Sequence, residues 1–222
     1  MPIIPVLYSN KFNELVLLKC LFLLVVLVGC SPPREPVKCS MKDSNCTVTN
    51  SYDAFLERTI CQAGNVVYSI SEQKLVSILS VVTEVQRKMK VVTHFSHSIP
   101  KLVCPDGQDG LLISTKNLNR VVKINLAVMM MTVESGVTLR LLRQLINEAA
   151  KAGLALPYAP YWWGLTIEGL LGSLVHDYVV EMRIVSPAKV QDGYAKVWVL
   201  NESDKDLNAA KVSLGVLGVI SH

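Results

Sequence analysis

Two of the four histidines in this 222-residue chain lie close together in the stretch VVTHFSHSIP, which runs from Val91 to Pro100. Ser96 and Ser98 place hydroxyl groups beside these histidines, directly after a β-branched run that favours a strand. A loop that presents hydroxyls and free backbone N–H groups can bind an anionic pyrophosphate. The stretch is therefore a candidate phosphate-binding loop, although the same residues also suit an ordinary polar loop.

The elements around this loop predict how it is positioned. NVVYSI at residues 65–70 is typical of a short strand, Ser71 caps a helix, and KVVT at residues 90–93 indicates a second strand. The helix has apolar residues at the i, i+3, i+4, i+7 spacing, namely Leu75, Ile78, Leu79 and Val82. Strand, helix and strand form a βαβ unit with a right-handed crossover, which places Thr93 and the following residues at a carboxyl edge of the sheet. Phosphate-bearing cofactors bind at such edges. Neither G-x-G-x-x-G nor G-x-x-x-x-G-K-[ST] occurs in the chain, so a different fold must hold any dinucleotide.

Later segments continue the alternation of strands and helices. GLLIST, VVKIN and MMMTVESG are predicted strands. A helix capped by Thr138 follows and ends at Gly153, and its apolar side is formed by Leu141, Leu142, Leu145, Ile146 and Ala149. The run Met129–Met131 is predicted to fill the core within its strand rather than to bind a soft metal. KVSLGVLGVIS is expected to be a helix end or a turn that leads into a strand, with Gly215 and Gly218 allowing close packing.

An aromatic and glycine-rich segment, GLALPYAPYWWGLTIEGLLGS, begins at Gly153. Two tryptophans and two tyrosines in it precede Gly164, Gly169 and Gly172. Glycines in such a place let the backbone approach a flat ligand closely. A packed turn filled with aromatic side chains explains the same residues equally well.

Residues 1–30 predict a signal peptide that is cleaved near Cys30. Their apolar stretch, Leu15 to Val28, follows a basic residue and precedes small residues and prolines. It is shorter than the ~20 apolar residues of a membrane span and contains Lys19, and an uncleaved membrane anchor is the alternative. The expected location is therefore the secretory pathway, with secretion to the cell exterior, cell wall or vacuole, or else anchoring in a membrane.

Four cysteines are left after such cleavage, and an even number in an oxidising compartment predicts disulfides. They are Cys39, Cys46, Cys61 and Cys104. The short loop between Cys39 and Cys46 makes this pair the first expectation, while the other pairings stay open. Zinc is the competing interpretation, but no C-x-x-C spacing occurs, and no metal site is predicted.

The segment from residue 31 to residue 55 is predicted to be a loop-rich leader. Proline, serine, asparagine and cysteine recur in it without a period. It also contains the glycosylation sequon NCT at Asn45, and a second sequon, NES, begins at Asn201. Both sequons agree with a secretory route, although such triplets also occur by chance.

Composition and charge exclude two classes of protein. Half of the residues are hydrophobic and 18% are charged, which allows a sizeable core in one large domain or two small ones and excludes a disordered chain. Without residues 1–30 the chain holds 20 basic and 17 acidic residues, and this small excess is scattered. The densest basic group, Arg87, Lys88 and Lys90, ends the predicted helix, where cations suit the helix dipole. Nucleic-acid binding is therefore not expected.

Several motifs occur in a characteristic order: HFSHSIP, LLISTKNLN, TVESGVTLRLLRQLINEAAKAGLALPYAPYWWGLTIEGLLGS, VHDYVVEMRIVSP and AAKVSLGVLGVIS. Together they resemble plant L-gulono-1,4-lactone oxidase-like proteins, which have an FAD-binding domain of the para-cresol methylhydroxylase (PCMH) or vanillyl-alcohol oxidase type. The resemblance covers about Pro32 to Ser221. It implies an α+β domain of two subdomains, a βαβ-containing N-terminal part and a second mixed α+β part, with FAD between them. Residues 1–30 would be the signal peptide, 31–55 the Cys- and Pro-rich leader, and 56–222 a PCMH-type domain that is incomplete at its C-terminal end.

The resemblance also implies which residues bind the cofactor. The FAD pyrophosphate would bind the loop formed by Phe95, Ser96, His97, Ser98 and Ile99. His97, which a serine follows, matches the histidine that relatives bond covalently to the 8α position of the flavin, and a neutral imidazole is a nucleophile that can add to an oxidised flavin. His94 stands where close relatives have an arginine, whose fixed charge suits a phosphate better. The other predicted cofactor-binding positions are Gly164, Gly169, Gly172, Ser173, Gly218 and Ile220, and no catalytic residue is assigned.

Two departures from the family pattern leave more than one hypothesis about function open. Relatives have a stretch of the type GTGAHGSSLWGKGSA where Ser173 here runs almost directly into His176, and they continue past GVIS into a substrate domain. The first hypothesis is an oxidoreductase whose FAD takes hydride from a sugar 1,4-lactone such as L-gulono-1,4-lactone, with oxygen or another electron acceptor, in ascorbate synthesis. The alternative is a truncated, non-catalytic secreted remnant of the flavoprotein fold. A third hypothesis, a recognition module held by disulfides, leaves the ordered motifs unexplained.

Overall fold

The structure is a computed structural model that describes Lys19 and residues 35–49, 61–94, 104–105, 107–138, 140, 147, 150–155, 166–170, 177–213 and 215–222. The chain divides into two units, Met1–Pro33 and Arg34–His222, and every strand belongs to the second. Apart from Lys19, the predicted signal peptide lies outside the described residues. Within those residues, no helix combines the length and the apolar character needed to cross a bilayer.

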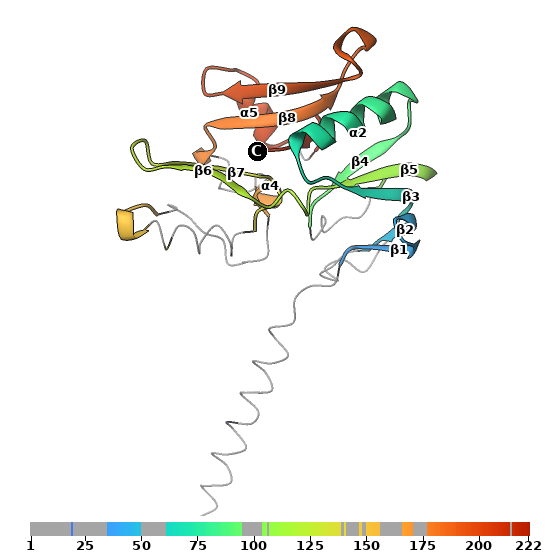
Figure 1. Cartoon of the computed structure of the whole chain (residues 1–222), viewed down its shortest axis with the longest axis horizontal. Coiled ribbons are helices and arrows are strands. Elements are labelled where there is room, and N and C mark those ends of the chain that lie inside the picture. The colour runs from blue at the N-terminus through green and yellow to red at the C-terminus, as the bar shows by residue number, and fades with distance from the viewer. Residues whose placement is uncertain are drawn as a thin grey trace, which may run out of the picture. The chain divides into compact units, whose positions relative to one another are not determined.

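The first sheet of the second unit has five strands in the spatial order β1-β2-β3-β5-β4 (Figure 1). Its strands are β1 (Val37–Met41), β2 (Ser44–Val48), β3 (Cys61–Tyr68), β4 (Met89–Val92) and β5 (Gly107–Ser114). β3, β5 and β4 run parallel, whereas β1 and β2 form an antiparallel hairpin on the other side of β3. Helix α2 (Glu72–Glu84) connects β3 to β4, which confirms the predicted order of strand, helix and strand. β5 lies between the two strands that the helix connects, so they are not direct neighbours.

Helix α2 begins where its sequence predicts and buries the predicted face. The Ser71 side chain accepts a hydrogen bond from the backbone N–H of Lys74 at 3.2 Å, which satisfies one of the free donors of the first turn. The buried residues of the helix are Leu75, Leu79 and Val82. Three of the four residues of the predicted apolar stripe are therefore buried, and the fourth, Ile78, packs against the same core as a partly buried residue.

A second sheet is antiparallel with the order β10-β8-β9, and β6 and β7 form a separate antiparallel pair. These strands are β6 (Val121–Asn125), β7 (Met130–Val133), β8 (Glu181–Pro187), β9 (Ala195–Asn201) and β10 (Val219–Ile220). The short helices are η2 (Ala150–Ala152), α4 (Ile167–Leu170), η4 (Val190–Asp192) and α5 (Leu207–Lys211). Helix α2 lies between the two sheets, and Leu79 of α2, Ile113 of β5 and Val185 of β8 belong to one buried cluster (Figure 1). One hydrophobic core therefore serves both sheets, which confirms the predicted α+β class.

The prediction of a loop-rich leader is wrong for residues 37–48, because β1 and β2 lie there. Cys46 and Val48 of β2 are buried at alternating positions, and this period of two is too short to recognise among polar residues. Cys39 and Cys46 are direct partners in the hairpin and form a disulfide with their Cα atoms 3.9 Å apart, as expected. A second disulfide joins Cys61 and Cys104. The first disulfide thus links the two strands of the hairpin, and the second links the first residue of β3 to Cys104.

The run Met129–Met131 does not fill the core, contrary to prediction. Met129 is 75% exposed and Met130 is 46% exposed, because the run forms the turn between β6 and β7 and the start of β7. The two strands pair only with each other, so part of this ribbon faces solvent.

Two further expectations concern helix ends. Helix α2 ends at Glu84 with no basic residue in its last turn, so Arg87 does not act on the helix dipole. Instead, its guanidinium donates to Asn65 Oδ1 at 2.7 Å and ties the end of the helix to β3. Most of the predicted helix 138–153 lies outside the described residues. Gly153 has a φ of +84°, which is the left-handed conformation expected of a glycine that ends a helix.

Candidate cofactor site

The parallel strands β3, β4 and β5 end at the same edge of the first sheet, and buried hydroxyl residues lie at all three ends. They are Ser69 after β3, Thr93 after β4, and Ser114 and Thr115 at the end of β5. Backbone hydrogen bonds connect these ends, because Ser69 N donates to Ser114 O and Thr115 N donates to Val92 O. Cofactors with phosphate groups bind at such an edge in open α/β sheets. The candidate phosphate-binding loop begins at this edge, directly after β4.

Three segments from the second half of the fold reach the same edge. In the turn after β7, Gly136 N donates to Leu118 O at 2.7 Å, and Ser135 N donates to Ser221 O at 3.1 Å. Glu168 N, at the start of α4, donates to Ser135 O at 3.0 Å. The turn after β7, helix α4 and the residue after β10 therefore converge on the end of β5. We call the residues that meet here the cradle: Thr115, Ser135, Gly136, Glu168 and Ser221.

Two glycines are required by the close approach of backbone segments. A Cβ atom on Gly136 would lie 2.2 Å from Thr115 O and 2.7 Å from Leu118 O. A Cβ atom on Gly218 would lie 2.5 Å from Val185 O, and the φ of Gly218 is +148°. The prediction that Gly218 allows close packing is confirmed, and its part in cofactor binding stays a prediction.

Glu168 places a carboxyl group with an unusual pKa in the cradle. Its Oε2 accepts a hydrogen bond from Thr115 Oγ1 at 2.8 Å. Burial raises the pKa of Glu168 to about 7, and the hydrogen bond from Thr115 opposes this only in part. Below neutral pH the group is therefore protonated and adds no negative charge to a site for a phosphate-bearing cofactor.

A cluster of three charged or titratable side chains lies at the carboxyl ends of β4 and β5. Glu35 Oε1 is 2.5 Å from Lys116 Nζ and 3.4 Å from His94 Nε2. Burial raises the pKa of Glu35, but Lys116 and then His94 outweigh burial and leave this pKa below its usual value. Burial lowers the pKa of His94 despite the nearby Glu35 carboxylate. His94 is therefore mostly neutral at pH 7, and the cluster pairs one basic side chain, Lys116, with one carboxylate, Glu35.

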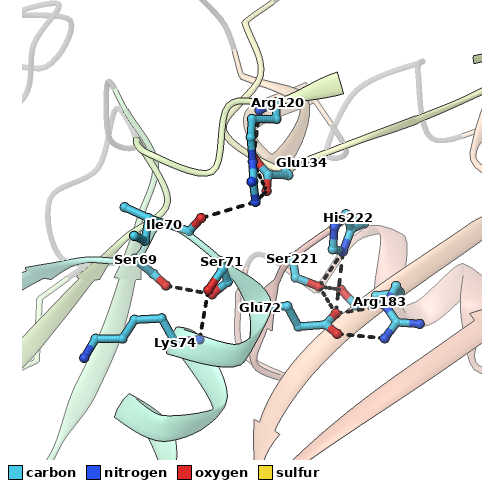
Figure 2. A network of polar contacts seen from close by, with 10 residues as sticks. All are labelled: Ser69, Ile70, Ser71, Glu72, Lys74, Arg120, Glu134, Arg183, Ser221 and His222. Carbon is cyan, nitrogen blue, oxygen red and sulfur yellow. Dashed lines mark hydrogen bonds and ion pairs between the residues drawn. The ribbon is translucent and has the colours of Figure 1, made fainter. Parts of the chain in front are cut away.

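A polar network connects the cradle to helix α2 (Figure 2). Glu72 Oε1 accepts from Arg183 Nη2 at 2.7 Å, and Glu72 Oε2 accepts from Arg183 Nε at 2.9 Å. Ser221 Oγ donates to Glu72 Oε2 at 2.7 Å, and His222 Nδ1 lies 3.5 Å from the same oxygen. The hydrogen bonds from Arg183 are the main reason that the pKa of Glu72 falls to about 2. This carboxylate ties α2 to β8 and to the residue that follows β10.

A second carboxylate fixes the turn that carries Ser135. Glu134 is 1% exposed and pairs with Arg120, whose Nη2 and Nε donate to Glu134 Oε1 at 2.6 and 3.0 Å. The backbone N–H of Arg120 donates to Glu134 Oε2 at 2.7 Å, and Arg120 Nη2 also reaches Ile70 O at 3.3 Å (Figure 2). The turn after β7 is thereby held to the loop after β5 and to the connection between β3 and α2.

The residues present fit a cofactor such as FAD on two grounds. Ser135 Oγ is buried and has no hydrogen-bond partner in the described part of the chain. Such an unsatisfied buried group costs about 1–3 kcal/mol, and a polar cofactor atom could satisfy it. Lys116, which is paired with Glu35, lies at the strand ends, and its ammonium group would bind a diphosphate there by sharing or leaving this ion pair. The described residues that would hold FAD are therefore Ser114, Thr115, Lys116 and Ser135.

The structure places only some of the site residues predicted from sequence. Those outside the described residues are Phe95, Ser96, His97, Ser98, Ile99, Gly164, Gly172 and Ser173. Of the others, Gly169 belongs to α4 directly after Glu168, Gly218 precedes β10, and Ile220 is buried in β10. His94 follows β4 at the carboxyl edge, as expected.

Sequence reasoning missed all five residues of the cradle. Thr115 could have been found by the argument that selected Thr93, because it also follows a predicted strand. Ser135 and Glu168 lie within the quoted motifs, but no spacing marks them, since their partners are distant in the sequence.

Parallel strands that end in buried hydroxyls, with a second sheet packed on the same helix, define a two-part α+β domain for a phosphate-bearing cofactor. A family model described as "FAD binding domain" matches residues 64–189. The chain belongs to this FAD-binding family, and its cofactor is FAD. A solved structure of alkyldihydroxyacetonephosphate synthase has a TM-score of 0.60 and covers 73% of this chain and 31% of its own, at 16% identity. That likeness confirms the predicted fold.

The chain is also similar to curated L-gulonolactone oxidases and to a dehydrogenase. The chain is 55% identical over 97% of its length to L-gulonolactone oxidase 5, and 57% identical over 91% to probable L-gulonolactone oxidase 6, both of Arabidopsis thaliana. It is also 30% identical over 73% of its length to L-gulono-1,4-lactone dehydrogenase of Mycobacterium tuberculosis. The alignments span 38%, 36% and 37% of these relatives. The predicted resemblance to plant L-gulono-1,4-lactone oxidase-like proteins is confirmed.

Proposed function

We propose that this chain provides the FAD-binding part of an oxidoreductase that oxidises a sugar 1,4-lactone such as L-gulono-1,4-lactone, in ascorbate synthesis. The observation that carries the proposal is the 55% identity to L-gulonolactone oxidase 5 across 97% of the chain. The proposed electron acceptor is oxygen, which would be released as hydrogen peroxide. The chain spans about 38% of the length of that relative. The oxidase activity is therefore proposed for a protein in which this FAD-binding part is joined to the remaining parts of such a relative.

Residues of the chain would bind and orient the cofactor. FAD, when bound, supplies the acceptor for a hydride. Lys116 and the hydroxyl of Ser114 would donate hydrogen bonds to phosphate oxygens at the strand ends, while the hydroxyl of Thr115 holds Glu168 in place. Ser135 would donate its unpaired hydroxyl to a polar cofactor atom, and protonated Glu168 would avoid repulsion of the phosphates. The Phe95–Ile99 loop would complete the pyrophosphate site, and His97 is the proposed point of covalent flavin attachment.

A chimera tests the proposed function. This chain would replace the matching segment of Arabidopsis L-gulonolactone oxidase 5, with the relative's own stretch kept after Ser173. The purified chimera would be assayed for bound FAD and for peroxide formation from L-gulono-1,4-lactone. We expect bound flavin and lactone-dependent peroxide. A chimera that folds but binds no FAD would overturn the proposed cofactor site, and one that binds FAD but oxidises no lactone would overturn the proposed substrate.

Two variants of the chimera locate the site. Thr115→Val and Ser135→Ala should each weaken FAD binding, because each removes a hydroxyl from the cradle. Ser77→Ala is the matched control, since Ser77 is an exposed hydroxyl on α2 whose Oγ donates only to Gln73 O of the same helix. Equal FAD affinity in all three variants would show that the cofactor binds elsewhere.

We propose further that the chain enters the secretory pathway and is secreted as a glycoprotein. The two disulfides support this route, because such bonds persist in oxidising compartments. The apolar stretch and following small residues within 1–30 support it independently. Any membrane attachment would be through an uncleaved signal anchor. Protection of the chain from added protease in intact microsomes, and loss of that protection in detergent, is the expected result.

A further inference from the structure

The two glycosylation sequons lie in very different surroundings. One begins at Asn45 in β2, and the other begins at Asn201, the last residue of β9. Both asparagines are exposed, so exposure alone does not separate them as acceptors. The hydrogen bonds and backbone conformation around each asparagine do separate them.

The Asn201 sequon forms a local, exposed turn. Ser203 Oγ donates to Asn201 Oδ1 at 2.6 Å, and Ser203 N donates to the same oxygen at 2.9 Å. Asn201 N donates to Asp204 Oδ2 at 2.8 Å, and Asp204 N donates to Asn201 O at 2.8 Å. All of these bonds join residues at most three apart, so the turn can form without the rest of the fold. The sequon hydroxyl is in contact with the acceptor carboxamide, and no described residue accepts a hydrogen bond from Asn201 Nδ2.

The Asn45 sequon is constrained by the β1–β2 hairpin. Asn45 has a φ of +51°, and its Nδ2 donates to Ser40 Oγ at 2.7 Å. The middle residue, Cys46, is fully buried and is bonded to Cys39. Thr47 Oγ1 donates to Lys38 O at 3.2 Å across the hairpin, away from the carboxamide. Asn45 Nδ2 and the Thr47 hydroxyl therefore both donate hydrogen bonds to β1, and the Cys39–Cys46 disulfide holds the two strands together at this point.

We infer that Asn201 is the N-glycosylation site of this chain and that Asn45 is left unmodified. This inference rests on the secretory route proposed above. The co-reactant is an oligosaccharide carried on a polyisoprenyl pyrophosphate. Asn201 Nδ2 forms a bond to the anomeric carbon of the sugar, and the bond from that carbon to the pyrophosphate oxygen breaks. The lipid pyrophosphate leaves with the electron pair, and the proton lost from Nδ2 passes to a base of the transferase.

A glycan on Asn201 would project from the end of β9, an outer strand of the second sheet (Figure 1). This strand also exposes Trp198 and Val199, which are 47% and 46% exposed. An outer strand with apolar side chains is open to pairing with another chain. A bulky polar group at its end would hinder such pairing, so loss of the glycan should also increase aggregation.

The test expresses the full 222-residue chain in cultured mammalian cells and measures glycan occupancy by peptide mass spectrometry before and after enzymatic deglycosylation. The wild type and Asn45→Gln should carry one glycan, whereas Asn201→Gln and Ser203→Ala should carry none. Ser203→Thr keeps the hydroxyl and should keep the glycan.

Protease protection of microsomes in the same samples separates the two proposals. A protected chain with an unmodified Asn201, or with its glycan on Asn45, would overturn the choice of site while leaving the secretory route intact. A chain found only in the cytosol would overturn the route and this inference together. Neither result would bear on FAD binding, which the chimera measures.

Discussion

Replacement of Glu72 by glutamine measures how strongly helix α2 is held to β8. Glu72 accepts hydrogen bonds from Arg183 Nε, Arg183 Nη2 and Ser221 Oγ, and its pKa falls from 4.5 to about 2. Each unit of pKa corresponds to about 1.4 kcal/mol, so the ionised carboxylate contributes at most about 3 kcal/mol. The Glu72 side chain is 20% exposed and that of Arg183 is 35% exposed, and solvent therefore screens part of this energy. We expect Glu72→Gln to reduce the free energy of unfolding by about 1–2 kcal/mol at pH 7.

The pH dependence of this effect has a definite sign. Because the pKa of Glu72 is lower in the folded state, its contribution is complete above about pH 4.5 and is lost as the pH falls toward about 2. Urea unfolding of the wild type and Glu72→Gln, followed by circular dichroism from pH 7 to pH 3, should show the difference in stability shrinking over the acid range.

The matched control is Glu84→Gln, at the exposed last residue of the same helix, and it should change stability little at any pH. Equal stability of Glu72→Gln and wild type at pH 7 would refute the proposed energy of this contact. A difference that is as large at pH 3 as at pH 7 would show that shape, rather than charge, is responsible.

Four other predictions follow from the structure and the sequence. Thiol counting on denatured, secreted protein should find fewer than four free thiols, since both disulfides would be closed, and four would contradict them. In the chimera, His97→Ala should release the flavin colour from acid-precipitated protein while His94→Ala should not; equal loss would indicate a non-covalent role for the loop. Relative to Glu168→Gln, the wild type should lose stability as the pH rises from about 4.5 to about 7, by at most about 3 kcal/mol, and urea unfolding that shows no such trend would contradict the raised pKa of Glu168. Purified residues 31–222 with added FAD and L-gulono-1,4-lactone should form no peroxide above a protein-free control. These residues match only about 38% of L-gulonolactone oxidase 5, and residues that orient a substrate can supply ~7–11 kcal/mol of barrier lowering. Clear turnover would show that residues 31–222 are sufficient for the reaction.

Local signals predicted the elements near the cofactor site well. Ser71 caps α2 because its side chain reaches a donor only three residues away, and the apolar stripe of the helix is buried as its spacing requires. The Cys39–Cys46 disulfide was likewise expected from a short loop. The same local reasoning failed for Met129 and Met130, because their composition suggests a core but they lie at the exposed turn between β6 and β7.

The cradle itself could not be predicted, because its residues meet over long distances in the sequence. Glu168 bonds to Thr115 across 53 residues, and Ser221 bonds to Glu72 across 149. The sequence around one residue of such a pair does not predict which distant residue it will contact. Nor could the sequence show that β5 would be inserted between β3 and β4 and so bring Thr115 between the other two strand ends.

By itself, the sequence determined helix α2 and the strands on either side of it, because capping and periodicity act over a few residues, but it did not reveal the β1–β2 hairpin. Its ordered motifs also determined the family, and with it FAD as the cofactor. Only the tertiary structure decided that the pKa of Glu168 rises to about 7 and that the buried hydroxyl of Ser135 has no hydrogen-bond partner among the described residues. It also decided that Lys116 pairs with Glu35 at the strand ends. Burial and hydrogen bonding by distant segments set these properties, and they exist only once both sheets have packed against α2.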